Sequence, residues 1–322
     1  MADGGAEDDH EPVVFHKRTL TSKMRLREIV DTIARYAFKT SPYPVIISLE
    51  NNCRELASQR KAAAIFRAGF GRALVTGPIC GSSEAVMPSP EELKRRIIIK
   101  GKRLPPAASL EDLDELERQH GLASELSDLV WYAASKRFTG DFEEPLGGQW
   151  AYHLMTSIEE ARSSKYSAKR LSEYRRLTAR HLVKVYPHGL RFFSGNYDPL
   201  PHWRAGAQMI SLNYQTTDTS PMALNEALFE GNGRCGYVLK PWYMTDEEAM
   251  VGLVREPVKE HCRFIIRVLC AFNLPVVGRR SIIDPFVQIR LFGTKSFQRG
   301  FRRRKRKKRK RTPVVKNNGQ CR

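Results

Sequence analysis

The sequence lacks paired cysteines, a secretion signal and any long apolar run. Its six cysteines include no Cys-x-x-Cys pair and no metal-ligand spacing, which favours free thiols in a reducing, intracellular setting. The first residues, MADGGAEDDHEP, are acidic and do not follow the basic-then-apolar order of a signal peptide. No apolar stretch approaches the length that spans a membrane, so any membrane contact is expected to be peripheral.

Positive charge is abundant but unevenly distributed. The formal net charge of the 322 residues is +19, and the single run Arg302–Arg311, RRRKRKKRKR, supplies ten positive charges. The rest of the chain is moderately basic, which suits anionic ligands or membrane surfaces without distinguishing between them. Hydrophobic residues make up 41% of the chain, enough for a sizeable core, and the length allows two domains.

The pattern of apolar residues predicts an α/β fold. Residues Val45 to Leu49 and Ile97 to Ile99 read as strands that are apolar on both faces, and Met24 to Phe38 has apolar residues at helical spacing. Such strands, alternating with helices, are typical of a parallel sheet. Further strands are expected at Val13–Phe15, Leu129–Ala133, Gly189–Phe193 and Gln208–Tyr214, and helices at Ala62–Ala68 and Ser157–Arg180.

Two segments depart from this alternation. Residues 103–124 open on two prolines, are acidic in the middle and carry no strand signal, so they are interpreted as a linker with a short helix. From His261 onward the sequence is rich in β-formers and poor in helix, which predicts a second, all-β domain from about residue 256. Two or three strands are too few for an independent β domain, so this domain is expected to be incomplete.

Polar residues gather where the expected strands end. In a parallel α/β barrel, the catalytic groups lie at the C-terminal ends of the strands. A carboxylate suits a hard cation, a histidine suits proton transfer, and several cations suit phosphates. Each candidate also has a plainer interpretation: a histidine in a turn or in the core, a carboxylate that caps the next helix, or solvated lysines. The candidates are His16, Glu50, Lys100, Lys102, Ser135, Lys184 and Tyr186.

Several long blocks resemble eukaryotic phosphoinositide-specific phospholipase C. The block TLTSKMRLREIVDTIARYAFKTSPYPVIISLENNC is similar to the X region of that family. The blocks ELSDLVWYAASKRF, VYPHGLR, SGNYDPLPHWRAGAQMISLNYQT and NGRCGYVLKP are similar to its Y region. FIIRVLCAFNLP and IIDPFVQIRLFG resemble the start of its C2 domain, so the order of domains is most like the delta type.

The resemblance implies a fold and a set of boundaries. The expected fold is a TIM-type (β/α) barrel that lacks its first two strands, followed by an incomplete all-β C2 domain. The expected parts are an acidic segment at 1–12, the remaining X region at 13–102, the linker at 103–124, the Y region at 125–245, and a partial C2 domain at 256–322 with a basic insertion at 302–311.

The resemblance also implies a reaction. The family hydrolyses phosphatidylinositol 4,5-bisphosphate to diacylglycerol and inositol 1,4,5-trisphosphate and uses Ca²⁺. His16 matches the histidine that helps to protonate the leaving oxygen, and Glu50 matches a Ca²⁺ ligand. Tyr186 matches the tyrosine that packs against the inositol ring. The residues that match the phosphate-binding positions are Lys100, Lys102, Ser135 and Lys184.

The chain also departs from the family pattern. The strands that carry a His-Asn pair and a Glu-x-Asp pair are not in this sequence, and only Asp3-Gly4 resembles the motif that follows them. With three of four protein Ca²⁺ ligands missing, this exact polypeptide is expected to have little or no activity. Lys184 stands where the family has arginine, and Leu190 stands where tryptophan is common. A non-catalytic phosphoinositide-binding or scaffold protein is therefore the alternative.

The expected partners are a phosphoinositide lipid and an anionic membrane surface, with no nucleic acid, and no upstream activator is identified. The chain is expected to be cytoplasmic and peripherally membrane-associated. The run Arg302–Arg311 has three interpretations: a nuclear or nucleic-acid tract, a segment that binds anionic lipid, or a solvated insertion. The acidic residues 111–117 are expected to cover a basic barrel mouth.

Overall fold

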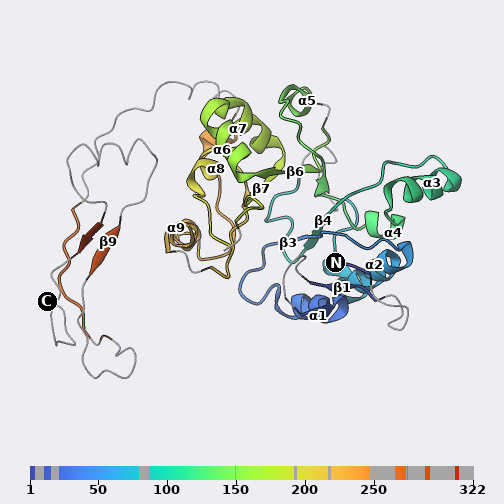
Figure 1. Cartoon of the computed structure of the whole chain (residues 1–322), viewed down its shortest axis with the longest axis horizontal. Helices are drawn as coiled ribbons and strands as arrows, with labels where there is room; N and C mark the ends of the chain where they lie inside the picture. Colours follow the sequence, from blue (N-terminus) through green and yellow to red (C-terminus); the bar gives the residue numbers. More distant parts are fainter. Residues whose placement is uncertain are drawn as a thin grey trace. The chain divides into compact units, whose positions relative to one another are not determined.

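The computed structural model of the chain describes residues 1–3, 11–15, 22–79, 87–148, 150–191, 194–216, 219–246, 265–272, 274, 287–290 and 309–311. The chain divides into two compact units, residues 1–254 and residues 255–322, and each is considered by itself. Figure 1 shows the elements of both units along the chain.

Parallel strands form the centre of the first unit. In the described part of this unit they are β3 (Val45–Ser48), β4 (Ile97–Lys100), β5 (Ala134–Ser135), β6 (Leu154–Glu159), β7 (Leu182–Tyr186) and β8 (Met209–Ile210). Strand β3 pairs with β4, and β5 to β8 pair in chain order, all in parallel. A parallel bridge between Gly101 and Ala134 connects the two groups. The expected parallel α/β class is confirmed.

Helices connect and cover these strands. They are α1 (Leu26–Tyr36), α2 (Leu56–Phe70), α3 (Leu110–His120), α4 (Ser124–Ser127), α5 (Glu143–Leu146), α6 (Glu160–Lys169), α7 (Leu171–Arg180), α8 (Leu200–Arg204) and α9 (Thr219–Glu230), with 3₁₀ turns η2 (Gly71–Ala73) and η3 (Trp242–Met244). Helix α1 buries Leu26 and Val30, one helical turn apart, on one side. Helix α2 is rich in alanine, the strongest helix former, and ends at Gly71, whose φ is +49°.

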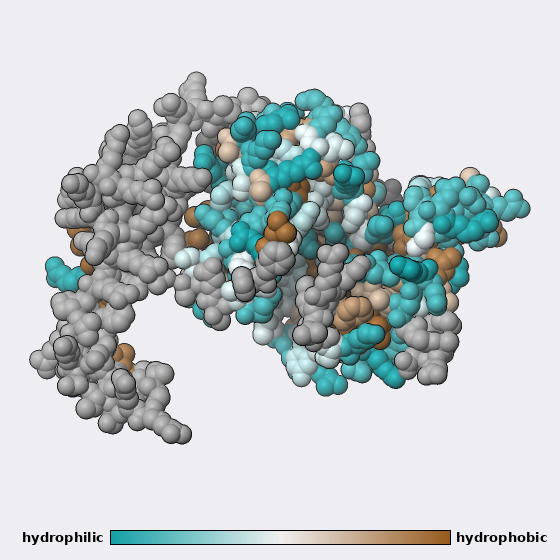
Figure 2. Space-filling view, in the orientation of Figure 1, coloured by the Kyte–Doolittle hydropathy of each residue, from teal (hydrophilic) through white to brown (hydrophobic). Residues whose placement is uncertain are grey.

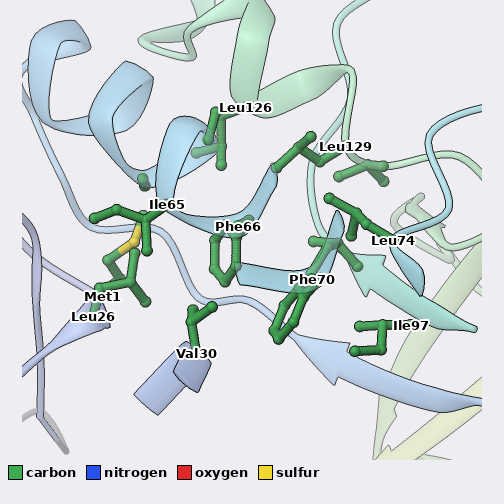
Figure 3. Packing of buried hydrophobic residues seen from close by; sticks show 14 of the residues in the cluster. Met1, Leu26, Val30, Ile65, Phe66, Phe70, Leu74, Ile97, Leu126 and Leu129 are labelled. Carbon is green, nitrogen blue, oxygen red and sulfur yellow. The ribbon is translucent and has the colours of Figure 1, made fainter. Parts of the chain in front are cut away.

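The main core lies between the first strands and helices α1, α2 and α4. Figure 3 shows Phe66 and Phe70 of α2 between Val30 on one side and Leu126 and Leu129 on the other. All of these side chains are at least nine-tenths buried. Burying one such aromatic or leucine side chain stabilises a fold by about 1.5–3 kcal/mol. This packing fixes the helix side of β3 and β4 and leaves their other face for the interior of the barrel.

A second core packs the later strands against helices α6, α7 and α8. Val183 and Val185 of β7 are fully buried against Tyr174 and Leu177 of α7. A third cluster lies on the opposite face of the strands, where Ile98 of β4 is buried with other apolar side chains. Its remaining buried members are Val75, Leu93, Tyr132, Ala133 and Met155. The strands are therefore apolar on both faces over their first residues.

Several expected strands are placed differently. The apolar stretch 129–133 is a turn after α4, and β5 is only the pair Ala134–Ser135. Residues 189–191 belong to a loop, and the true strand β7 precedes them. Strand β6 occupies the start of the region expected to be helical, before α6 and α7. The prediction of a strand at 208–214 is right in place but too long, because β8 has two residues.

The strand expected at Val13–Phe15 lies outside the parallel sheet. β1 (Val13–Val14) pairs antiparallel with β2 (Met24–Arg25), and Val13 also bridges Ala2. The short ladder holds the N-terminal residues against the start of α1, where the Leu26 amide donates to Pro12. The prediction that this segment is a strand is correct, but the prediction that it is a strand of the barrel is wrong.

Two short strands of the second unit form an antiparallel ladder. β9 (Gln288–Arg290) pairs antiparallel with β10 (Arg309–Arg311), so the last residues of the basic run lie opposite β9. A C2 domain stays a prediction. Among the described residues, no helix is long and apolar enough to cross a membrane. The face of the first unit seen in Figure 2 is largely hydrophilic, including the end that carries α3.

Candidate active site

The alternation of side chains along each strand brings the polar candidates to one face of the sheet. In β3, Val45 and Ile47 pack toward the helices, whereas Ile46 belongs to the interior cluster. Side chains alternate along a strand, so Ser48 and Glu50 follow Ile46 onto the interior face. The same rule places Lys100 on the same face of β4 as Ile98, which belongs to the interior cluster. Polar side chains at the strand ends thus stand on an apolar floor.

Strand β7 delivers two more candidates to the same face. Val183 and Val185 are buried against the helices, while Leu182 packs in the interior cluster. Lys184 and Tyr186 therefore point inward by alternation. The parallel register also matches Ser48 with Lys100 across β3 and β4, which sets both at the same height.

Direct contact between distant strands confirms that these side chains converge. The ammonium group of Lys184 donates a hydrogen bond to the Ser48 hydroxyl at 3.2 Å, although 136 residues separate them in sequence. Burial lowers the pKa of Lys100, and the positive charge of Lys184 lowers it further, while Glu50 acts in the opposite direction. Lys100, Lys184 and Glu50 therefore interact electrostatically within one polar cluster.

Ser135 and Lys102 extend this cluster along the neighbouring strand end. The Ser135 amide donates to the Gly101 carbonyl at 2.8 Å, which places Ser135 beside the Lys100–Lys102 segment. Both Ser135 and Lys102 are exposed. Beyond them, the Arg103 guanidinium lies 4.6 Å from the centroid of the Trp131 ring. The strand ends therefore present hydroxyl and ammonium donors suited to a phosphate group.

Tyr186 stands at the end of β7 and is 39% exposed. Its position in the ladder is fixed by pairing with Glu159 of β6. Leu190, in the loop that follows, is 66% exposed. Tyr186 follows Lys184 on the same face of β7, so an amphipathic side chain stands at the end of a strand that also carries a cation.

The helix-capping interpretation of Glu50 does not hold. The N-terminal amides of the segment before α2 are satisfied by other side chains: Asp3 accepts from Arg54 and Glu55 at 2.8 and 3.2 Å. Asn51 accepts from the amide of Cys53 at 3.0 Å. The carboxylate of Glu50 is exposed and acts electrostatically on Lys100.

The described residues do not make up a calcium site. They contain no group of three or more His, Cys, Asp or Glu side chains that could hold a metal ion. Ca²⁺ takes six to eight oxygen ligands, and Glu50 supplies two at most. His16, which the sequence assigns to proton transfer, lies outside the described residues.

Two serines of this face escaped sequence reasoning. Ser48 lies two residues before Glu50, and Ser157 pairs in register with Lys184. The Ser157 hydroxyl is buried and has no hydrogen-bond partner in the described part of the chain. The two-residue alternation back from Glu50 and from Glu159 is the signal that would have found them.

The acidic helix α3 is anchored away from the lysines. Its Glu117 accepts a hydrogen bond from Arg60 of α2 at 2.6 Å and another from the amide of Ser124 at 2.5 Å. Gln59 of α2 donates to the carbonyl of Gly121 just after the helix. Figure 1 shows α3 at the outer edge of this unit, beyond α4. The contacts of α3 thus lie on the helical side of the sheet. These contacts do not place residues 111–117 over the barrel mouth, where the sequence predicted them.

Two family models match the segments that build this site. Residues 2–103 match the model described as phosphatidylinositol-specific phospholipase C, X domain. Residues 126–243 match the Y domain of the same description. The chain belongs to the phosphoinositide-specific phospholipase C family. In this phospholipase C chain, the X segment supplies Glu50 and Lys100, and the Y segment supplies Ser135, Lys184 and Tyr186.

Two curated relatives of this phospholipase C chain are of the delta type. It is 36% identical over 318 residues to human 1-phosphatidylinositol 4,5-bisphosphate phosphodiesterase delta-1, covering 88% of this chain and 42% of the relative. It is 36% identical over 316 residues to the delta-3-A protein of Danio rerio, covering 89% of this chain and 40% of the relative. The chain therefore spans about two fifths of the length of these relatives.

Solved phospholipase C structures share the fold. The crystal structure of S. officinalis PLC21 superposes with a TM-score of 0.66 at 32% sequence identity, over 77% of this chain and 32% of that one. The crystal structure of L. pealei PLC21 gives a TM-score of 0.65 at 31% identity, over 74% of this chain and 32% of that one. The expected TIM-type barrel is confirmed by this likeness.

Proposed function

We propose that this chain binds the phosphorylated headgroup of phosphatidylinositol 4,5-bisphosphate and acts in its hydrolysis to diacylglycerol and inositol 1,4,5-trisphosphate. The observation that carries the proposal is the convergence of Lys100, Lys184 and Ser48 from three strands onto one face. The X and Y matches and the names of the delta-type relatives support the same substrate.

Electrostatics explains why such a cluster would favour a phosphorylated ring. Lys100 is partly buried next to a second ammonium group, and both effects disfavour its charged form. A phosphate placed between Lys100 and Lys184 would offset this repulsion and accept charge-assisted hydrogen bonds. Ser135 and Lys102 lie along the same edge and would bind a second phosphate, while Tyr186 would pack on the ring between them.

Titration of the purified chain with inositol 1,4,5-trisphosphate tests the headgroup assignment. Removing one charged contact costs about 1.5–3 kcal/mol, so Lys100→Met is expected to weaken binding at least about tenfold. Lys165→Met, an exposed lysine on α6, is the matched control and should bind like the wild type. Equal affinities for wild type and Lys100→Met would contradict the proposed site.

Calcium is the cofactor that the family resemblance implies. Among the causes that shift the pKa of Lys100, Glu50 is the carboxylate, and this effect places its charge within reach of the cluster. The described donor set does not fit Ca²⁺, which takes six to eight oxygen ligands. The proposed role of the described residues is to bind and orient the headgroup.

A non-catalytic phosphoinositide-binding protein is the second candidate. It is favoured by the lack of a carboxylate or histidine cluster among the described residues, while the phosphate-binding lysines are present. Vesicles that contain phosphatidylinositol 4,5-bisphosphate, incubated with the chain in Ca²⁺ or in chelator, separate the two. Release of inositol trisphosphate supports the enzyme, and headgroup binding without release supports the binding protein.

We also propose a peripheral site of action at an anionic, cytoplasmic membrane surface. The ten consecutive cations of Arg302–Arg311 and the exposed Leu190 support it. Each cation near an anionic surface contributes about 1 kcal/mol, and salt screens the attraction. Co-sedimentation with phosphatidylserine vesicles should weaken as salt rises and should fall when the run is replaced by Ser and Gly. Nuclear accumulation that depends on the run would favour the nuclear interpretation instead.

A further inference from the structure

A single buried carboxylate holds the loop that follows β7. Glu160 is the first residue of α6, directly after β6, and only 8% of it is exposed. Its carboxylate accepts two hydrogen bonds from the guanidinium of Arg191, at 2.5 and 2.6 Å. It also accepts one from the backbone amide of His188 at 2.7 Å. A bidentate pair of this kind fixes both distance and orientation.

The ionisation of this pair matches its geometry. Burial alone would raise the pKa of Glu160, but the hydrogen bonds from Arg191 and His188 outweigh burial and hold the pKa below its usual value. The bond to Glu160 raises the pKa of Arg191. Both groups therefore stay charged at neutral pH, and the contact persists as an ion pair.

A second set of contacts fastens the far end of the loop. Arg191 lies 6.0 Å from the centroid of the Tyr197 ring, and Tyr197 donates its hydroxyl to the carbonyl of Val185 at 2.9 Å. Val185 is the residue directly before Tyr186. The Tyr197 ring also packs edge-on against His202 of α8, at 5.1 Å between centroids. The loop is thus held at Glu160, the start of α6, and its far end is connected through Tyr197 to the strand that carries Tyr186.

We propose that Glu160 and Arg191 are positioning residues that set Tyr186 and Leu190 at the mouth of the barrel. Glu160 follows Glu159, which pairs in register with Tyr186, so the carboxylate bridges the ends of adjacent strands. The hydrogen bonds that Glu160 and Arg191 make among the described residues run to the loop and not to the phosphate-binding lysines. The pair acts through the loop, and its effect on headgroup binding rests on the proposed function.

Hydrogen exchange of the full-length chain tests directly whether the Glu160–Arg191 pair holds the loop. Arg191→Lys keeps the positive charge but gives up the planar fork, and Glu160→Gln keeps the shape but gives up the charge. Both are expected to speed amide exchange in residues 187–191 at least about tenfold by raising the population of the open loop. The matched control is Arg170→Lys, because Arg170 pairs with Glu173 at 3.0 Å outside this loop. Unchanged exchange in both variants overturns the proposal.

Binding of inositol 1,4,5-trisphosphate separates positioning from bare structure. Arg191→Lys is expected to lose about fivefold or more in affinity for the trisphosphate, because the ring loses a placed Tyr186. Its affinity for inorganic pyrophosphate, which has no ring, should equal that of the wild type. Faster exchange with unchanged trisphosphate affinity overturns the positioning role. If the wild type binds no trisphosphate, the proposed function fails. Amide exchange in the loop still shows whether the Glu160–Arg191 pair holds residues 187–191.

Discussion

Lys240 lies far from helix α7 in the sequence, but its side chain reaches the C-terminal end of that helix. There its ammonium group donates a hydrogen bond to the carbonyl of Thr178 at 2.6 Å. The same carbonyl, in the last turn of α7, also accepts a hydrogen bond from the side-chain amide of Gln208 at 2.7 Å, so two side chains satisfy this helix end. Burial lowers the pKa of Lys240 to about 8. At the scale of single residues, a favourable hydrogen bond and an unfavourable desolvation therefore meet on one side chain.

The pKa of Lys240 predicts how stability depends on pH. An unfolded lysine titrates near 10.4, so between pH 8 and about 10 the unfolded chain binds more protons and stability rises with pH. From pH 7.5 to 9.5 the free energy of unfolding should gain about 2 kcal/mol from this residue. Urea unfolding at the two pH values measures it. Lys240→Met should lose the gain and Lys165→Met should keep it, and a gain of equal size in Lys240→Met would refute the prediction.

A second prediction at this scale concerns the two interior lysines. Because the positive charge of Lys184 contributes to the lowered pKa of Lys100, Lys184→Gln should raise that pKa toward its ordinary value. The ¹³Cε resonance of Lys100, followed through an alkaline titration, measures the change. Lys136→Gln, an exposed lysine paired with Glu144, is the control. An unchanged titration in Lys184→Gln would mean that the two ammonium groups are not coupled.

At the scale of elements, helix α3 shows how an acidic segment is held on the fold. Ser109 caps its first turn by accepting from the Asp112 amide, and Gly121 closes it in the left-handed region with a φ of +57°. Glu117 connects it to α2 through Arg60. The other acidic residues of the helix are solvent-exposed. One buried carboxylate, together with Leu113 and Leu116 packed against the main core, therefore attaches the helix.

Glu117→Gln should destabilise the first unit by about 1–3 kcal/mol, because a buried charge-assisted bond is lost. Glu115→Gln is the matched control, since Glu115 pairs with Arg118 on the exposed face of the same helix. Its effect should stay below about 0.5 kcal/mol. Urea unfolding measures both variants. Equal effects would show that the Arg60–Glu117 contact does not anchor the helix.

The strands show what the sequence could and could not predict. The isoleucine runs of β3 and β4 were predicted because both faces of those segments are apolar. Strands β6 and β7 were missed because their inward positions, such as Ser157 and Lys184, are polar toward the site. The stretch 129–133 has the apolar pattern of a strand because Leu129 and Tyr132 are buried on different sides, in two separate clusters. Its residues belong to no strand ladder, so it is a turn.

The site was predictable one residue at a time but not as a set. Resemblance to the family suggests Lys100, Ser135 and Tyr186 as site residues, which stays a prediction, and the structure brings Lys100 and Lys184 together. The contact between Lys184 and Ser48 was not predictable, because it depends on how the sheet curves between residues 136 positions apart. His16 stays a prediction, as it lies outside the described residues.

At the scale of the whole first unit, the X and Y segments share one structure. The Gly101–Ala134 bridge joins their strands, and Lys184 reaches Ser48 across them. Away from the site, Tyr237 donates to the carbonyl of Pro44 and Ser41 donates to that of Cys235, both at 2.7 Å. Contacts of this kind tie the two segments together independently of the chain between them.

Cutting the connection between the segments should therefore leave them associated. A protease site inserted after Pro106, before helix α3, allows the full-length chain to be nicked after folding. The nicked protein is expected to elute in size-exclusion chromatography at the volume of the intact protein and to separate only in denaturant. Elution as two smaller species in native buffer would show that covalent continuity, not shared packing, keeps the segments together.

The repulsion between Lys100 and Lys184 has a consequence for thermodynamic linkage. An anion bound between them, as proposed, would raise the pKa of Lys100 again, so binding would take up a proton wherever the free site has lost one. Headgroup affinity should then fall as pH rises through the lowered pKa of Lys100. The heat of binding should vary with the ionisation enthalpy of the buffer. Ligand capture and proton capture become one event at this barrel mouth.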